Sequence, residues 1–197
     1  MNSSISKPAL RQQLRERRDA FVSTLSDEDR QRLEAAAAAR LLNLLGPGIW
    51  ASYVAMGTEI SPADLAALAP ATQPIAYPWF ASRTGQMQFR LAGSAGLADG
   101  NGFVRGPFGI RQPDAASAQV TPDWIVMPLV GCDARGNRIG QGAGHYDRAL
   151  AALRPTRKII TIGLAWDVQL LDTLPADPWD QPLDFIITPG RTIAART

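Results

Sequence analysis

A glycine-rich segment in the second half of the chain has the residue types of an anion-binding loop. Three of its glycines alternate with other residues: Gly140, Gly142 and Gly144. The apolar run 124–130 predicts a buried strand before the segment, and the alanine- and leucine-rich run after Tyr146 predicts a helix that ends near Leu153. A helix start carries free amides and the positive end of the helix dipole, and glycines let an anion approach the backbone. We therefore expect phosphate binding between this strand and this helix.

The spacing of these glycines separates the segment from the two common phosphate-binding loops. It lacks the Gly-Lys-Ser/Thr ending of the P-loop, and its G-x-G-x-G spacing differs from the dinucleotide fingerprint G-x-G-x-x-G. Asp147, in the first predicted helical turn, could hold a Mg²⁺ ion, because Mg²⁺ commonly binds one or two carboxylates together with substrate phosphates. The alternative is a purely structural turn in which Asp147 satisfies the helix dipole and Arg148 lies in solvent.

The composition places the chain among ordinary globular proteins. Its 197 residues are 46% hydrophobic and 19% charged, which suits a single domain (1–197) with a sizeable core. The formal net charge of +2 does not require a nucleic-acid partner. A single cysteine, Cys132, excludes an internal disulfide and a cysteine-based zinc cluster. Because no apolar run reaches the ~20 residues of a membrane span, and residues 1–30 lack an apolar signal core, we expect a cytoplasmic protein. Separately, we expect a monomer.

The N-terminal region predicts a helix with two stripes. Ser6 is a suitable N-cap, and residues 1–6 are expected to form a loose tail. In the run 7–22 one face is apolar, and a stripe about 100° away is basic. The basic stripe contains Lys7, Arg11, Arg15 and Arg18. At the edge of a buried face these cations could reach a ligand that lies against the core, and the alternative is an ordinary solvated face.

The remaining apolar runs predict an α/β fold around a mostly parallel sheet. Strand, helix and strand patterns follow one another between residues 49 and 77, and continuous apolar strands are expected at 159–165 and 183–188. In such sheets ligands bind at the carboxyl ends of strands. Glu59 follows the first of these strands, although a simple loop carboxylate is the more common interpretation.

Two further features could contribute to a binding site. Trp79, Phe80 and Phe108 could supply a flat apolar wall for an aromatic ligand, or they could be plain core residues. Residues 92–107 contain repeated glycines, which predict a long loop that could act as a lid.

The glycine-rich segment resembles the signature of the 5-formyltetrahydrofolate cyclo-ligase (5,10-methenyltetrahydrofolate synthetase) family, approximately Pro-x-x-x-Phe-Asp-x-x-Gly-x-Arg-Leu-Gly-x-Gly-x-Gly-Tyr-Tyr-Asp. The chain matches this signature at Pro128, Asp133, Gly136, Arg138, Gly140, Gly142, Gly144, Tyr146 and Asp147. It departs at Cys132, Ile139 and His145, where the signature has Phe, Leu and Tyr. Lys7 and Arg11 match the family's N-terminal Lys-x-x-x-Arg, and the similarity extends over residues 7–188. The resemblance implies a three-layer α/β/α fold of the NagB/RpiA/CoA-transferase-like type.

The resemblance also implies which residues form the site. It implies ATP binding by Lys7, Arg11, Arg138, Ile139, Gly140, Gln141, Gly142, Ala143, Gly144, His145 and Tyr146. It implies substrate binding by Val54, Glu59, Gln141, Gly142, Ala143, Gly144 and His145. It implies Mg²⁺ binding by Asp147 and Asp180, with Asp177 and Asp184 as rivals of Asp180, because their proline-rich loop aligns in more than one way. Asp167 and Gln169, at the end of another strand, are further candidates, and residues 106–113 are expected near the pocket.

The family's reaction is compatible with this set of residues. The chain has one histidine and one cysteine, and phosphoryl transfer needs few nucleophiles because it depends mainly on positioning and charge stabilisation. The resemblance implies that ATP phosphorylates the formyl oxygen of 5-formyltetrahydrofolate, with or without a polyglutamate tail, and that ring closure gives 5,10-methenyltetrahydrofolate, ADP and phosphate. Arg138 would stabilise the phosphoryl charge. Two alternatives remain open: a non-catalytic folate- or nucleotide-binding regulator, and a sugar-phosphate isomerase on the same fold.

Overall fold

The computed structural model describes residues 6–92 and 102–195, and in these residues one sheet has eight strands. Their spatial order is β13 (Thr192–Ala194), β12 (Phe185–Ile187), β10 (Ile160–Leu164), β7 (Trp124–Pro128), β1 (Trp50–Ala51), β2 (Ile75–Trp79), β3 (Gln88–Ala92) and β6 (Gln119–Val120). The strands from β12 to β2 are parallel to one another, whereas β13, β3 and β6 pair antiparallel at the two edges. The predicted α/β fold with a mostly parallel sheet is therefore confirmed.

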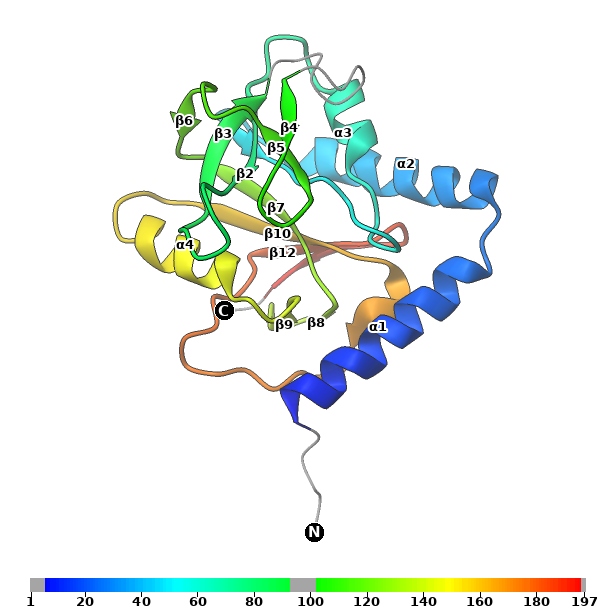
Figure 1. Ribbon diagram of the computed structural model, residues 1–197. Coiled ribbons are helices and arrows are strands. Elements are labelled where there is room, and N and C mark those ends of the chain that lie inside the picture. Colours follow the sequence, from blue (N-terminus) through cyan, green and yellow to red (C-terminus); the bar gives the residue numbers. More distant parts are fainter. Residues whose placement is uncertain (1–5, 93–101, 196–197) are drawn as a thin grey trace.

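Helices cover both faces of this sheet, which gives three layers (Figure 1). Helices α2 (Asp27–Leu44) and α3 (Ala63–Leu68) pack on one face, and α4 (His145–Leu153) packs on the other. Strand β7 shows why both faces of the sheet need a cover of helices. Alternate side chains of a strand point to opposite faces, and those of β7 are apolar on both. Val126 joins the core cluster beneath α2 and α3, whereas Ile125 and Met127 join the cluster beneath α4.

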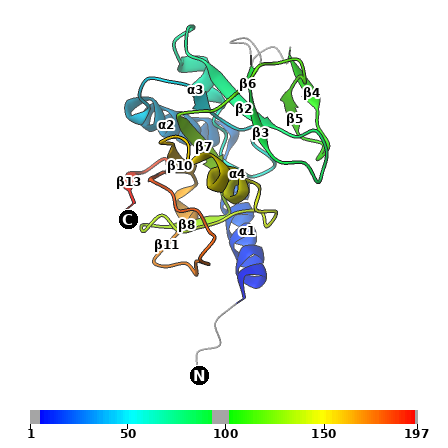
Figure 2. The same ribbon diagram turned by 90° about the vertical axis from the view of Figure 1, so that its left-hand side faces the viewer.

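Helix α1 (Lys7–Ser23) lies beyond the main sheet, beside a smaller three-stranded sheet (Figure 2). The smaller sheet has the order β11 (Leu170–Leu171), β8 (Gly131–Asp133) and β9 (Arg138–Ile139). Leu14 of α1 is 4% exposed and packs with Val130 and Ile139. A Cβ at Gly131 would lie 2.6 Å from the Leu14 side chain, so glycine allows this close approach without a shift of Leu14. The observed bounds and the Ser6 cap agree with the predicted N-terminal helix.

The hairpin formed by β8 and β9 separates the central strand from the glycine loop, and the sequence did not predict it. Asp133, which is fully buried, holds the hairpin closed. Its carboxylate accepts hydrogen bonds from the backbone amides of Arg135 and Asn137 and from the Asn137 side chain. It also accepts one from the amide of Leu174, far along the chain. This long-range contact explains why local sequence patterns did not predict the hairpin.

A second hairpin, formed by β4 (Phe103–Arg105) and β5 (Arg111–Pro113), covers the end of β2. Gln112 fixes it there, because its side-chain amide pairs with both the backbone N–H and the carbonyl of Phe80. Most of the predicted 92–107 lid, residues 93–101, lies outside the described residues, as does the predicted tail up to residue 5. None of the helices in the described ranges is long and apolar enough to cross a membrane.

Candidate active site

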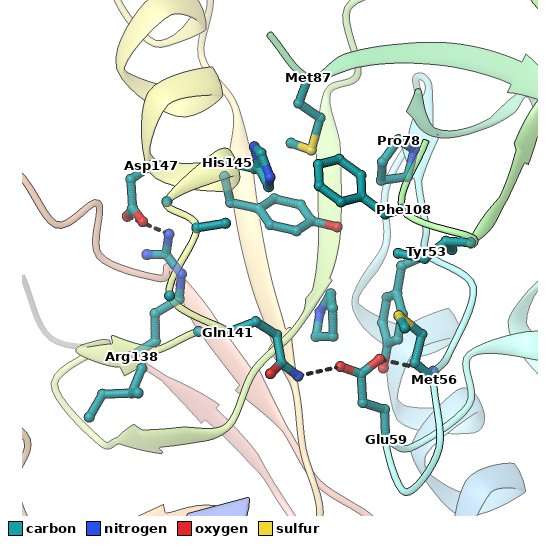
Figure 3. A pocket seen from close by; sticks show the side chains of 18 of the residues that line it. Tyr53, Met56, Glu59, Pro78, Met87, Phe108, Arg138, Gln141, His145 and Asp147 are labelled. Atoms are coloured by element: carbon teal, nitrogen blue, oxygen red, sulfur yellow. Dashed lines mark hydrogen bonds and ion pairs between the residues drawn. The ribbon is translucent and has the colours of Figure 1, made fainter. Parts of the chain in front are cut away.

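A cavity of about 1200 Å³ opens at the carboxyl ends of β1, β2 and β7 (Figure 3). Its walls come from α1, the loop 53–59, the β4–β5 hairpin, residues 138–148 and the loop 177–180. Ligand pockets usually have volumes of ~300–1,000 Å³, so this cavity has room for a large ligand or for two smaller ones. It lies where parallel α/β sheets generally bind ligands.

The glycine loop forms one wall of this cavity, and every residue from Arg138 to Arg148 lines it. Gly142 has φ +107°, and a Cβ there would lie 3.3 Å from the Arg11 guanidinium carbon. Gly144 has φ +64° and is the N-cap of α4, which begins without a side-chain cap. Positive φ favours glycine at both positions. Because α4 starts without a side-chain cap, its first amides can face an anion, and the phosphate binding expected from the sequence stays a prediction.

The basic stripe of α1 contacts the cavity walls. The Arg11 Nε donates to the carbonyl of Gly140 at 2.8 Å, and Arg15 donates to the Gln141 side chain at 2.7 Å. Arg18, only 6% exposed, donates to the Thr58 hydroxyl at 2.9 Å. Since Lys7, Arg11 and Arg18 all line the cavity, the structure favours the prediction of a cationic rim over that of a solvated face.

The predicted cations and the predicted metal-binding carboxylates pair with one another. The Lys7 Nζ lies 2.6 Å from a carboxylate oxygen of Asp177 and 2.6 Å from one of Asp180. Arg138, whose side chain is 6% exposed, lies 2.6 Å from the Asp147 carboxylate. Lys7 and Arg138 therefore already have partners of opposite charge, which compensates these partly buried charges, whereas Arg11 donates to a backbone carbonyl.

These pairs also bring the two predicted magnesium ligands to the same side of the cavity. The backbone amide of Gln181 donates to the Asp147 carboxylate at 3.1 Å, and Arg138 donates to the carbonyl of Gln181. Asp180 is therefore adjacent to a residue that contacts Asp147. No cluster of three or more metal-ligating side chains is found in the described parts of the chain. A pair of carboxylates is nevertheless the usual protein contribution to a Mg²⁺ site that also uses phosphate oxygens.

The ion pairs of Lys7 shift two pKa values. Burial lowers the pKa of Lys7, but its hydrogen bonds and charge interactions with Asp177 and Asp180 outweigh burial and raise the pKa above its ordinary value. Burial raises the pKa of Asp180, but the Asp177 amide, Lys7 and the charge of Arg138 outweigh burial and lower it. Both residues therefore stay charged over the whole neutral range.

Glu59 faces the glycine loop from the opposite wall, as Figure 3 shows. It is 5% exposed. One carboxylate oxygen accepts from the Gln141 side chain at 2.9 Å, and the other accepts from the Met56 amide at 3.0 Å. Val54 lines the same wall. The resemblance implied substrate binding by Val54 and Glu59, and these two residues lie together in the wall. Glu59 is held in place by its own loop and by Gln141.

Three aromatic rings form a cluster in the cavity wall. The ring centroids of Phe80 and Phe108 are 5.0 Å apart, and that of His145 lies 4.7 Å and 5.3 Å from them. Burial, followed by the neighbouring charge of Arg148, lowers the pKa of His145. Trp79, which was also predicted as part of a possible aromatic wall, does not line the cavity. The guanidinium carbon of Arg90 lies over its ring, 4.2 Å from the ring centroid.

Three predicted candidates do not reach the cavity. Gln169 is buried and accepts a hydrogen bond from the amide of Trp166 while it donates to two backbone carbonyls. Asp167 accepts hydrogen bonds from Thr188 and Gly190. Asp184 accepts from Thr161. All three satisfy local backbone or hydroxyl groups, so Asp177 and Asp180 are the carboxylates of the C-terminal region that line the cavity.

Several residues of the cavity wall were not predicted from the sequence. Tyr53, Met56, Pro78 and Met87 come from strand ends or the loops beside them, and Trp179 comes from the proline-rich loop. The nearness of Tyr53 and Met56 to Glu59 in the sequence was a usable signal. Trp179 lies between the two rival carboxylates Asp177 and Asp180, which was a signal of the same kind.

Comparisons with known proteins point to one family. The model of the 5-formyltetrahydrofolate cyclo-ligase family matches residues 3–189. The 5-formyltetrahydrofolate cyclo-ligase of Mycolicibacterium smegmatis is 36% identical over 97 residues, which are 47% of this chain and 49% of that protein. The enzyme of the same name from Haemophilus influenzae is 40% identical over 84 residues, which are 41% of this chain and 44% of that protein. The matched region thus spans about half the length of these curated relatives.

Solved structures match over nearly the whole chain. The NMR structure of Aquifex aeolicus 5,10-methenyltetrahydrofolate synthetase has a TM-score of 0.74 at 25% identity, over 95% of this chain and 94% of that one. The 5,10-methenyltetrahydrofolate synthetase of Mycoplasma pneumoniae has a TM-score of 0.68 at 26% identity, over 94% and 99%. Since the family model covers almost the entire sequence, the chain belongs to the 5-formyltetrahydrofolate cyclo-ligase family.

Proposed function

We propose that the protein uses ATP to convert 5-formyltetrahydrofolate to 5,10-methenyltetrahydrofolate, with release of ADP and phosphate. The observation that carries this proposal is the layout of one cavity, in which a cation-rimmed glycine loop faces a buried carboxylate beside apolar and aromatic side chains. A reaction that transfers a phosphoryl group from a nucleotide to a large co-substrate with aromatic rings needs both kinds of surface within one pocket.

The phosphate half of the proposed site uses groups that can stabilise negative charge. The uncapped start of α4 offers backbone amides, and Lys7, Arg11 and Arg138 are among the cations that line the cavity. These groups would hold the triphosphate and orient its γ-phosphoryl group toward the formyl oxygen. Arg138 would stabilise the charge on the transferring group, which is the main catalytic demand of phosphoryl transfer.

The carboxylates Asp147 and Asp180 suit a Mg²⁺ ion in this half of the site. Both line the cavity, and the contact between Asp147 and the amide of Gln181 brings their segments together. When bound, the ion would neutralise charge on the phosphate oxygens. Lys7 and Arg138 would then exchange their carboxylate partners for phosphate oxygens, so the charges of the site stay balanced with and without ligands.

The other half of the proposed site would hold the folate. Glu59 can accept hydrogen bonds from ring N–H groups of the pterin, and the cluster of Phe80, Phe108 and His145 offers apolar ring surface. After phosphorylation of the formyl oxygen, N10 of the same substrate would attack the formyl carbon, and phosphate would leave as the five-membered ring closes. The nucleophiles thus belong to the substrate, so the protein only has to position and shield them.

Absorbance measurements can test this function directly. Purified protein with Mg-ATP and 5-formyltetrahydrofolate should produce the near-ultraviolet chromophore of the methenyl product together with an equal amount of ADP. Omission of ATP should abolish the signal. A folded protein that binds both ligands and forms no product would contradict the proposal.

A further inference from the structure

The cavity has two chemically different ends, and α1 runs from one to the other. Lys7 contacts Asp177 and Asp180 at one end, and Arg18 contacts Thr58, next to Glu59, at the other. The two cations are eleven positions apart in the helix, which is about 16.5 Å at 1.5 Å per residue. The glycine loop meets α1 between them, through Arg11 and Arg15.

This layout fixes the direction of a bound nucleotide, given the proposed function. The γ-phosphoryl group has to face the formyl group, and Glu59, next to Thr58, would hold the pterin at the Thr58 end of the cavity. The α-phosphate and the nucleoside must therefore extend the opposite way, past the glycine loop toward Lys7 and the loop 177–180. A purine ring at that end needs a flat partner to cover its face.

Trp179 is the aromatic side chain at that end of the cavity. It lines the cavity and yet is 69% exposed, the largest value among the exposed large hydrophobic residues of the described chain. Other tryptophans are core residues, such as Trp50 at 5% and Trp166 at 0% exposure. Because this exposed indole also lines the cavity, its ring surface is available to a ligand bound there.

The backbone around Trp179 is held firmly on both sides. The amide of Asp180 donates to the carbonyl of Asp177, and the amide of Asp177 donates back to the Asp180 carboxylate at 2.8 Å. Lys7 then ties both carboxylates to α1. The indole is therefore presented on a turn that is anchored beside the predicted phosphate and metal positions.

We infer that Trp179 is the platform on which the adenine ring of the nucleotide stacks. This inference rests on the proposed use of ATP and adds the residue that recognises the base. Stacking has little base specificity, because every purine has a similar face. The structure therefore assigns Trp179 to affinity for the nucleoside part and not to affinity for the phosphates.

Calorimetric titration with two ligands separates these contributions. In the presence of Mg²⁺, Trp179→Ala should weaken ADP binding about tenfold, as expected for loss of one stacked base, and should leave binding of inorganic tripolyphosphate within twofold of the wild type. Trp179→Phe keeps a smaller ring and should lose less than Trp179→Ala. Leu68→Ala is the matched control, since Leu68 is 59% exposed and lies outside the cavity, and both affinities should stay unchanged.

The outcomes distinguish this inference from the proposed function. Unchanged ADP affinity in Trp179→Ala, with a wild type that binds ADP and forms product, overturns the inference alone. An equal loss of ADP and tripolyphosphate affinity also overturns it, because Trp179 would then act by positioning the carboxylate loop. A wild type that binds neither ligand overturns the proposed nucleotide site itself.

Discussion

The segments that follow β7 and β10 start from neighbouring parallel strands and end very differently. The two strands pair in register up to Pro128 and Leu164, so their following segments leave the sheet at the same edge. After β7 the chain leads into a glycine loop that lines the cavity. After β10 the polar side chains of Asp167 and Gln169 form hydrogen bonds with backbone and hydroxyl groups of the protein itself. A position at the carboxyl edge of a sheet is thus not enough to form a binding site. Polar groups there must also remain available, so that a ligand can use them.

Substitution of Gln169 should produce the largest effect on stability. Gln169→Leu removes an amide that satisfies three buried backbone groups, the N–H of Trp166 and the carbonyls of Leu129 and Val130. At 1–3 kcal/mol for each unsatisfied group, the free energy of unfolding should fall by about 3 kcal/mol or more in urea titrations. The KM for ATP of the folded variant should change less than in Arg138→Ala. A stable variant with lost nucleotide binding would reverse the contrast between the two segments.

Substitution of Arg138 should have the largest effect on ligand binding. Arg138→Ala removes a charge-assisted contact worth about 1.5–3 kcal/mol, so the KM for ATP should rise about ten- to hundred-fold. Arg138→Lys should recover only part of this loss, because the ammonium group lacks the planar fork of the guanidinium. Arg154 is a suitable control, as it pairs with Asp184 outside the cavity, and Arg154→Ala should leave the KM unchanged. An unaltered KM in Arg138→Ala would remove Arg138 from the site.

Neutralisation of Asp147 should change the metal requirement. Asp147→Asn keeps the shape but loses the charge, so the Mg²⁺ concentration for half-maximal activity should rise about tenfold, as expected for loss of a contact of about 1.4 kcal/mol. Asp184→Asn is the matched control, because that carboxylate bonds to Thr161 away from the cavity. Equal metal titrations of the two variants would leave Asp147 with a structural role only, as the partner of Arg138 in the first turn of α4.

The smallest expected effect concerns the pH dependence of stability. The folded-state pKa of Asp180 lies below its ordinary 3.8, and that of Lys7 lies above its ordinary 10.5. Their interaction therefore contributes fully between these values, and it is lost as pH falls through the folded pKa of Asp180 or rises through that of Lys7. Lys7→Met should lower the free energy of unfolding by about 1 kcal/mol at pH 7. The difference from the wild type should shrink well below pH 3.8, and a difference that persists there would show that Lys7 acts by packing.

The sequence predicted those features that depend on local patterns. Continuous apolar runs located the inner strands, and the spacing of Lys7, Arg11 and Arg18 placed these cations beside the cavity. The pairing of Lys7 with Asp177 and Asp180 was beyond such patterns, because about 170 residues separate the partners. The same holds for the β8–β9 hairpin, which Asp133 closes through a contact with Leu174. For Asp167 and Gln169, only the folded structure shows that their hydrogen-bonding capacity is already used.

The hydrogen bond between Gln141 and Glu59 links the two halves of the pocket through a single side chain. Gln141 belongs to the loop that would meet the nucleotide, and Glu59 belongs to the wall that would meet the folate. A displacement of the loop by one ligand therefore alters the hydrogen bonding available to the other. Thermodynamic linkage requires this influence to be mutual, so the factor by which the nucleotide changes folate affinity must equal the factor by which folate changes nucleotide affinity.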